Sequence, residues 1–67
     1  MIALTVNGTS RHFEETLSCL ELLERLELAG KRVALERNGE IVPRSRHGAE
    51  MLCDGDELEI VVAVGGG

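Results

Sequence analysis

The sequence predicts an α+β domain in which one helix packs across a sheet of four or five strands. Three observations predict this class. Segments of alternating apolar residues lie near both ends of the chain, two Asn-Gly pairs mark tight turns, and one leucine-rich segment with helical spacing lies between them. Because that segment has a single apolar stripe to bury, the helix is expected to cover one face of the sheet.

The first hairpin is expected at the start of the chain. In the segment Ile2–Val6 the large apolar residues alternate, which is the period of a half-buried strand. Asn7 and Gly8 follow, a pair suited to a type I′ turn because both central residues of that turn have positive φ. The segment Thr9–Phe13 then forms the returning strand.

The helix start has a capping signature. Ser18 can accept a hydrogen bond from the backbone N–H of Glu21, whose carboxylate can reach back to Ser18, and together they form a capping box. Leu17 and Leu22 have the spacing of a hydrophobic staple around this cap. Gly30 is expected as the residue just past the end of the helix.

The face of the helix that meets the sheet is predicted from its leucines. Leu20, Leu23 and Leu26 are expected to share that face. Cys19 is interpreted as a small buried hydrophobe.

The second half of the chain repeats the strand pattern. Val33–Arg37 and Glu40–Val42 are expected as strands around an Asn38-Gly39 turn, and Pro43 ends the second of them. Residues 44–51 are polar and irregular, with one short helical turn. After a turn at residues 53–56, residues 58–64 form the last strand, the strongest β signal in the chain.

Composition and charge limit the kinds of partner. The 67 residues suffice for one domain, 43% of them are hydrophobic, and Phe13 is the only aromatic, so an aliphatic core is expected. The net charge of −5 argues against nucleic acid and anionic membranes as partners. No signal peptide or membrane-spanning stretch is recognisable, so a cytoplasmic protein is expected.

No enzyme site is predicted. His12 and His47 lack metal-ligand spacing, so no metal site is expected, and an ordinary surface role is favoured for both histidines. The acidic residues at 54, 56 and 57 are interpreted as turn chemistry. Cys19 and Cys53 lack CxxC spacing; Cys53 lies beside a turn, and a sulfur-handling role for it is the minority interpretation. The chain alone is therefore not expected to be an enzyme.

The candidate reactive group is the carboxylate of Gly67. Gly65, Gly66 and Gly67 follow the last strand, reach about 10 Å when extended and carry no side chain to obstruct a narrow channel. Such an arm can place the carboxylate, ionised at neutral pH, in another protein's active site. Attack on the α-phosphate of ATP would give an acyl-adenylate that sulfur can open. The alternative is an inert terminus or linker.

The whole chain resembles bacterial sulfur carriers of the ThiS family. The similarity rests on its length, the Asn7-Gly8 hairpin, the helix with Leu22-Leu23, the Ile41-Val42-Pro43-Arg44 segment, the Asp54-Gly55-Asp56 turn before an apolar strand, and the Gly66-Gly67 end. The resemblance implies a ubiquitin-like β-grasp fold with a mixed four- to five-stranded sheet over residues 1–64, and a flexible tail over residues 65–67.

The resemblance also implies the chemistry of the tail. A ThiF-type adenylyltransferase would use ATP and Mg to adenylate Gly67. Gly66 would be the required small residue beside it, and Gly65 an additional glycine that lengthens the arm. A sulfur donor such as a cysteine desulfurase would supply the sulfur of the resulting thiocarboxylate. A ThiG-type thiazole synthase would accept it for thiamin biosynthesis. This chain itself would bind no cofactor.

Three alternatives stay open. The small subunit of molybdopterin synthase shares the fold and tail, but such proteins are usually longer. In ubiquitin-like modifiers a lysine opens the adenylate. A β-grasp binding module with an inert tail belongs to a different class, and deletion of Gly66 and Gly67 would leave its activity intact.

The outer sheet face is a predicted docking surface. If the even-numbered residues of the last strand face the helix, Val61 and Ala63 face outward, and Ala3 and Ala34 share that side by the same count. The face would then be small and apolar near the tail, with carboxylates further along, as interfaces often are. An ordinary outer sheet face is the alternative.

Overall fold

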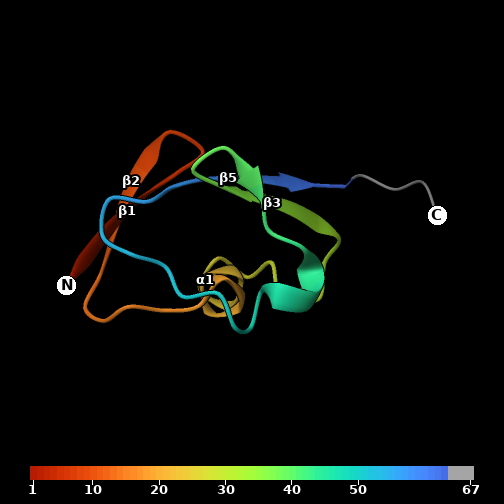
Figure 1. Ribbon diagram of the computed structural model, residues 1–67, viewed down its shortest axis with the longest axis horizontal. Coiled ribbons are helices and arrows are strands. Elements are labelled where there is room, and N and C mark those ends of the chain that lie inside the picture. Colours follow the sequence, from red (N-terminus) through yellow and green to blue (C-terminus); the bar gives the residue numbers. More distant parts are fainter. Residues whose placement is uncertain (64–67) are drawn as a thin grey trace.

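Across residues 1–63, which the computed structural model describes, one α-helix lies beneath one face of a five-stranded sheet (Figure 1). The strand order is β2-β1-β5-β3-β4, so the last strand in sequence is the central one. The predicted α+β class and mixed sheet are confirmed. The elements are β1 (Ile2–Val6), β2 (Thr9–Phe13), α1 (Cys19–Arg25), β3 (Val33–Arg37), β4 (Glu40–Ile41), a 3-10 turn (Arg44–Arg46) and β5 (Glu57–Val62).

Both Asn-Gly turns form as predicted. Asn7 and Gly8 have φ of 50° and 83°, and Asn38 and Gly39 have φ of 51° and 87°. Positive φ at both central residues matches the right-handed twist of the two antiparallel hairpins.

Strand β5 joins the two hairpins. It pairs in parallel with β1, where Thr5 lies opposite Glu57. On its other side it pairs antiparallel with β3, where Ala34 lies opposite Val61. The predicted strand, residues 58–64, was partly wrong, because β5 begins at Glu57 and ends at Val62, which leaves Ala63 outside it. Val64 lies outside the described residues.

The helix start is confirmed. The Glu21 N–H donates to Ser18 Oγ at 3.1 Å, and the Ser18 N–H donates to Glu21 Oε1 at 2.8 Å. Leu17 and Leu22 are both buried, as the hydrophobic staple requires.

The predicted helix end was wrong. The helix ends at Arg25, and Glu27, with φ of 60°, takes the left-handed position expected for Gly30. The Leu28 N–H donates to the Leu23 carbonyl at 2.7 Å and the Glu27 N–H to the Glu24 carbonyl at 3.1 Å, a Schellman arrangement. This arrangement places the half-buried Leu28 against the core.

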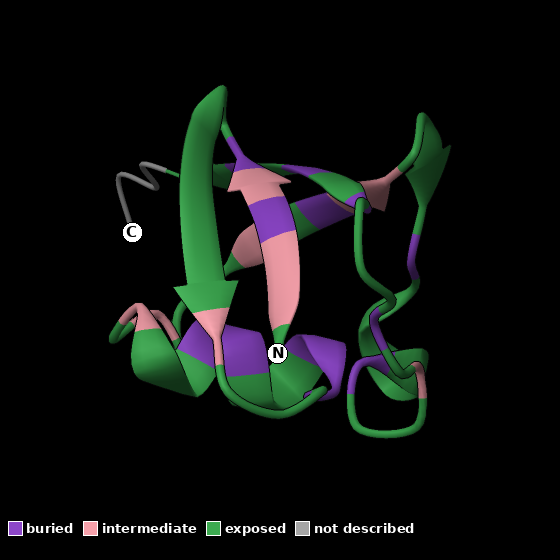
Figure 2. Ribbon diagram, turned by 90° about the vertical axis from the view of Figure 1, so that its left-hand side faces the viewer, coloured by how far each residue is buried: buried purple, intermediate pink, exposed green. Residues whose placement is uncertain are grey.

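The predicted leucine stripe was partly wrong. Cys19, Leu22 and Leu23 are the buried residues of α1, whereas Leu20 is 40% exposed. Residues 19, 22 and 23 share a face by helical spacing, and residue 20 lies about 100° around the axis from residue 19. In Figure 2, the buried part of α1 lies under the sheet, while the edge strand β2 is exposed along most of its length.

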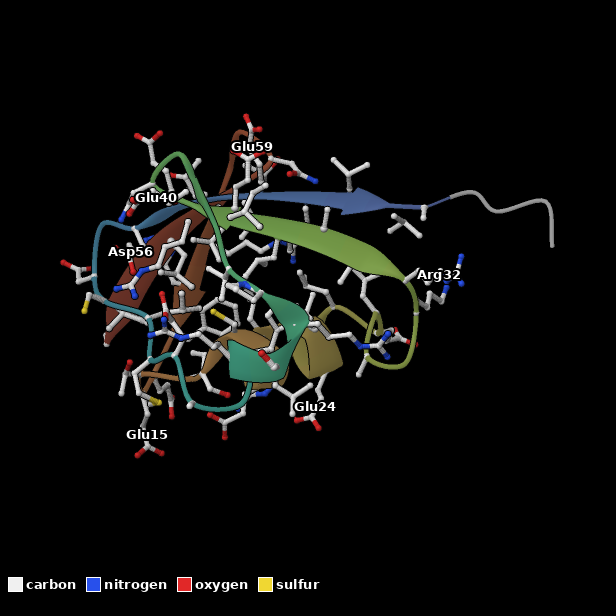
Figure 3. All side chains as sticks on the ribbon, turned by 45° about the vertical axis from the view of Figure 1, so that its right-hand side comes forward. Glu15, Glu24, Arg32, Glu40, Asp56 and Glu59 are labelled. Atoms are coloured by element: carbon white, nitrogen blue, oxygen red, sulfur yellow. The ribbon has the colours of Figure 1, made fainter. Side chains whose placement is uncertain are left out.

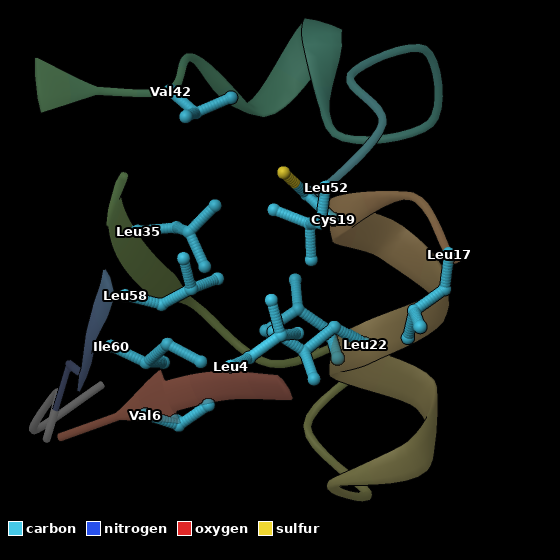
Figure 4. Packing of buried hydrophobic residues seen from close by; sticks show 11 residues of the cluster. Leu4, Val6, Leu17, Cys19, Leu22, Leu35, Val42, Leu52, Leu58 and Ile60 are labelled. Carbon is cyan, nitrogen blue, oxygen red and sulfur yellow. The ribbon is translucent and has the colours of Figure 1, made fainter. Parts of the chain in front are cut away.

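The core is aliphatic, as predicted. Leu22 of the helix and the inward leucines of three strands, Leu4, Leu35 and Leu58, belong to one buried cluster between helix and sheet (Figure 4). Two loop residues, Val42 and Leu52, close the core at the side where the 3-10 turn lies.

We predict that Leu22→Ala lowers the free energy of unfolding by about 2–5 kcal/mol, because it leaves a cavity at a fully buried position. Leu20→Ala, on the same helix, lowers it by less than about 1 kcal/mol. Urea unfolding measures both. Equal losses would contradict the assignment of the buried face.

Candidate functional site

The predicted reactive residues, Gly65, Gly66 and Gly67, lie outside the described residues. The structure does describe the base from which they follow. Strand β5 ends at Val62, and the Ala63 N–H donates to the Arg32 carbonyl at 2.9 Å. Arg32 lies at this end of the molecule, and Glu15 and Asp56 lie at the other (Figure 3). One edge of the last strand is thus bonded to the start of β3.

The Asn7 side chain holds the other edge of β5. Its Oδ1 accepts the Ile60 N–H at 2.8 Å, and its Nδ2 donates to the Ile60 carbonyl at 3.1 Å. These two bonds continue the ladder of β1 beyond the point where the β1 backbone turns away. Strand β5 is therefore held on its β1 edge as far as Ile60 and on its β3 edge as far as Ala63.

Three of the predicted docking residues lie together. Ala34 and Val61 are directly opposite on the outer sheet face, and Ala63 follows two residues later. All three are exposed, Val61 by 63%. We call Ala34, Val61 and Ala63 the outer patch.

The fourth predicted docking residue, Ala3, lies far from this patch. Ala3 shares the outer face, but its carbonyl accepts the Gly55 N–H at 2.8 Å, before β5 begins. Val61 lies six residues further along, roughly 20 Å away. The facing pair Glu36 and Glu59 lies between the two ends, where carboxylates were predicted.

A cluster around Arg37 was not predicted. Asp56 accepts hydrogen bonds from Arg37 Nε at 2.8 Å, Asn38 Nδ2 at 3.0 Å and the Cys53 N–H at 2.8 Å, and Arg37 also binds Glu50 at 3.2 Å. The signal available in the sequence was an arginine at an inward position of an otherwise apolar strand face. The cluster ties the loop before β5 to β3.

The pKa of Asp56 is lowered by this cluster. Burial opposes its ionisation, but the Cys53 N–H, the Asn38 amide and the Arg37 charge together outweigh that cost. The ionised carboxylate is thus favoured in the folded chain.

The cysteines and histidines differ in their surroundings. Burial, followed by the nearby Glu50 charge, raises the pKa of the Cys19 thiol, so Cys19 stays protonated and is the buried hydrophobe predicted. Cys53 is exposed, with Arg37 Nη2 at 3.5 Å from its sulfur. His12 is exposed as predicted.

The surface role predicted for His47 was wrong. It is only 5% exposed, and its Nε2 lies 3.0 Å from the Val42 carbonyl, so Nε2 carries the proton and donates. The 3-10 turn Arg44–Arg46 directs this side chain inward.

Two negative findings apply to residues 1–63. No three histidine, cysteine or acidic side chains in this part lie close enough to hold a metal ion. Its helix is too short to cross a membrane.

We predict that Asp56 makes stability depend on acid. Because its folded pKa is below the ordinary 3.8, its ionised form stabilises the fold above that value, and this stability is lost as the pH falls below it. In Asp56→Asn, the free energy of unfolding falls less steeply through this window. Urea unfolding from about pH 5 to pH 2.5 measures the slopes, and identical slopes would contradict the prediction.

Comparison with known proteins assigns the chain. The model of the ThiS family matches residues 4–67. The sulfur carrier protein ThiS of Bacillus subtilis is 40% identical over 96% of this chain and 98% of its own length. The crystal structure of a thiamine biosynthesis protein (ThiS) from Geobacter metallireducens superposes with a TM-score of 0.83 at 38% identity, covering 98% of this chain and all of that one.

A longer relative also contains this domain. A thiazole synthase of Paramagnetospirillum magneticum is 44% identical over 96% of this chain, which spans only 20% of that protein's length. A similar domain thus occupies about a fifth of a thiazole synthase. From the family match, the full-length relative and the superposition, we conclude that this chain belongs to the ThiS family.

Proposed function

We propose that this chain is a sulfur carrier of thiamin biosynthesis, and that Gly67 acts through its terminal carboxylate. The observation that carries the proposal is the family match, which extends through residue 67 and so includes all three glycines. The fold supports the proposal because β5, which leads to the tail, is bonded to Asn7 at Ile60 and to Arg32 at Ala63.

The proposed reaction needs no catalytic side chain from this chain. A carboxylate oxygen of Gly67 attacks the α-phosphorus of Mg-bound ATP, and pyrophosphate leaves. A persulfide on a donor such as a cysteine desulfurase then attacks the acyl carbon with its outer sulfur, and AMP leaves to give an acyl disulfide. A thiol then attacks the donor's sulfur, forms a new disulfide with it, and releases the thiocarboxylate of Gly67. A ThiF-type adenylyltransferase supplies the nucleotide site and the electrostatic stabilisation. The carrier supplies a carboxylate at the end of a slim arm.

The proposed acceptor of the sulfur is a thiazole synthase. It is supported by the two relatives of that name, in Paramagnetospirillum magneticum and Magnetococcus marinus, each of which contains a segment similar to this chain. The thiamin names of the relatives favour this pathway over molybdopterin synthesis. We propose the cytoplasm as the place where carrier and enzymes meet.

We predict that incubation with a ThiF-type enzyme, Mg-ATP and a sulfur donor adds AMP to Gly67 or exchanges one of its oxygens for sulfur. Intact-mass and fragment spectrometry locate the change. A chain lacking Gly66 and Gly67 serves as the control and stays unmodified. An unchanged mass of the full chain, with the enzyme active on another carrier, would favour the binding module with an inert tail.

We predict that Val61→Asp weakens binding to the adenylyltransferase at least tenfold, about 1.4 kcal/mol, because it places a charge in the outer patch. Its stability changes little, since Val61 is 63% exposed. Ser10→Asp is the matched control, because Ser10 is exposed on the same sheet face but on β2. Calorimetric titration measures both, and equal affinities would remove the outer patch from the interface.

A further inference from the structure

The two edges of β5 use alternate residues. The Ala63 N–H bonds to the Arg32 carbonyl, and the Asn38 N–H bonds to the Glu57 carbonyl, so the odd-numbered residues of β5 direct their backbone groups to β3. The Asn7 N–H bonds to the Leu58 carbonyl, and the Asn7 side chain bonds to both backbone groups of Ile60. The even-numbered residues therefore face β1.

Val62 is the next residue on the β1 edge, but β1 ends at Val6. Figure 1 shows β5 extending past the β1-β2 hairpin. Among residues 1–63, no hydrogen-bond partner lies beside the Val62 N–H and carbonyl on this edge. An exposed edge of this kind can pair with another strand.

A groove lies beside this open edge. It has a volume of about 290 Å³ and lies between the end of the first hairpin, the end of β5 and the turn that follows α1. Its apolar lining residues are Val6, Leu26, Leu28, Ile60 and Val62, and its polar ones are Asn7 and Thr9. Among residues 1–63, the exposed Arg11 is the one charged residue that lines it. Within the described part of the chain, Arg11 forms no salt bridge.

We infer that an extended segment of thiazole synthase pairs with the β5 edge at Val62, with an apolar side chain in the groove and a carboxylate at Arg11. This recognition mode combines backbone bonds for affinity with a pocket for specificity. The inference rests on the proposed function, because it takes thiazole synthase as the acceptor.

Three features favour this occupant. The unpaired N–H and carbonyl of Val62 can bond to an extended chain, and the apolar residues of the groove can contact an apolar side chain. Arg11 is a cation in a chain of net charge −5, and its charge would attract a carboxylate of the partner. Two relatives named thiazole synthase contain a segment similar to this chain within one polypeptide. In those proteins the segment and the rest of the enzyme are therefore always close enough to touch.

Replacing single backbone amides with esters tests the edge directly. Cys53 provides a ligation point, so a synthetic 53–67 peptide can be joined to residues 1–52. An ester at Val62 removes the N–H on the open edge, and we expect thiazole synthase binding to weaken about three- to tenfold without loss of stability. An ester at Val61 removes an N–H that faces β3, so it lowers the unfolding temperature and leaves affinity unchanged.

Charge reversal tests the groove. Arg11→Glu is expected to weaken binding about tenfold or more, whereas Arg44→Glu, at a residue that is also exposed but lies on the 3-10 turn, leaves affinity unchanged. Arg11→Lys restores most of the affinity. Equal losses for the two reversals would show an effect of net charge alone and overturn the inference.

Fluorescence anisotropy with the unmodified chain and thiazole synthase separates the two proposals. If the wild-type chain binds and the Val62 ester and Arg11→Glu bind equally well, the edge inference fails while the carrier function stands. If the wild-type chain does not bind, the proposed acceptor fails and the inference fails with it. Two other outcomes would also overturn the inference, because they assign the edge to another occupant. One is self-association of the chain that Arg11→Glu abolishes. The other is that the Val62 ester and Arg11→Glu weaken binding to the adenylyltransferase but not to thiazole synthase.

Discussion

The fold depends on the parallel pairing of β1 with β5. Each hairpin is a local unit, and β5 connects them by pairing with one strand of each. The β1-β5 ladder is short, with Thr5 opposite Glu57 and Val6 opposite Leu58, and the Asn7 side chain extends it to Ile60. Asn7 thus serves twice, since its positive φ also forms the first hairpin turn. Without the Asn7 side chain, the β1 edge of β5 would be paired only as far as Leu58.

Two further sets of interactions stabilise this arrangement: the core between the helix and the sheet, and the cluster around Arg37. Leu4, Leu35 and Leu58, on the inner face of three strands, form one buried cluster with Leu22 of the helix. At the end away from the tail, Asp56 joins Arg37 and the backbone of Cys53, which fixes where β5 begins. The position of β5 is thus set by contacts within the domain, and for the proposed partner enzymes such a pre-formed strand lowers the entropy lost on association.

Features that depend on neighbouring residues were predictable. The Asn7-Gly8 turn and the Ser18–Glu21 capping box need only residues within three positions of each other, and both form. The alternation of β5 correctly assigned Val61 to the outer face. These signals sufficed for the fold class, because each element carries its own pattern.

Features that depend on distant contacts were not predictable. The helix ends early because burial of Leu28 favours a left-handed Glu27, a preference that no local glycine indicated. His47 is buried by a bond to Val42 across a turn, and the Asn7 side chain binds a residue 53 positions away. The distance of Ala3 from the outer patch follows from the parallel direction of β1 and β5, which alternation cannot give.

The central place of β5 has a consequence for synthesis of the protein. The strand that completes the sheet is translated last among the described elements, so the two hairpins and the helix leave the ribosome before their common partner exists. Long-range pairing of this kind closes a long loop, from Thr5 to Glu57, at a late step. Assembly of the sheet must therefore await residues 57–62, and a nascent chain that stops short of them lacks the strand on which both hairpins assemble.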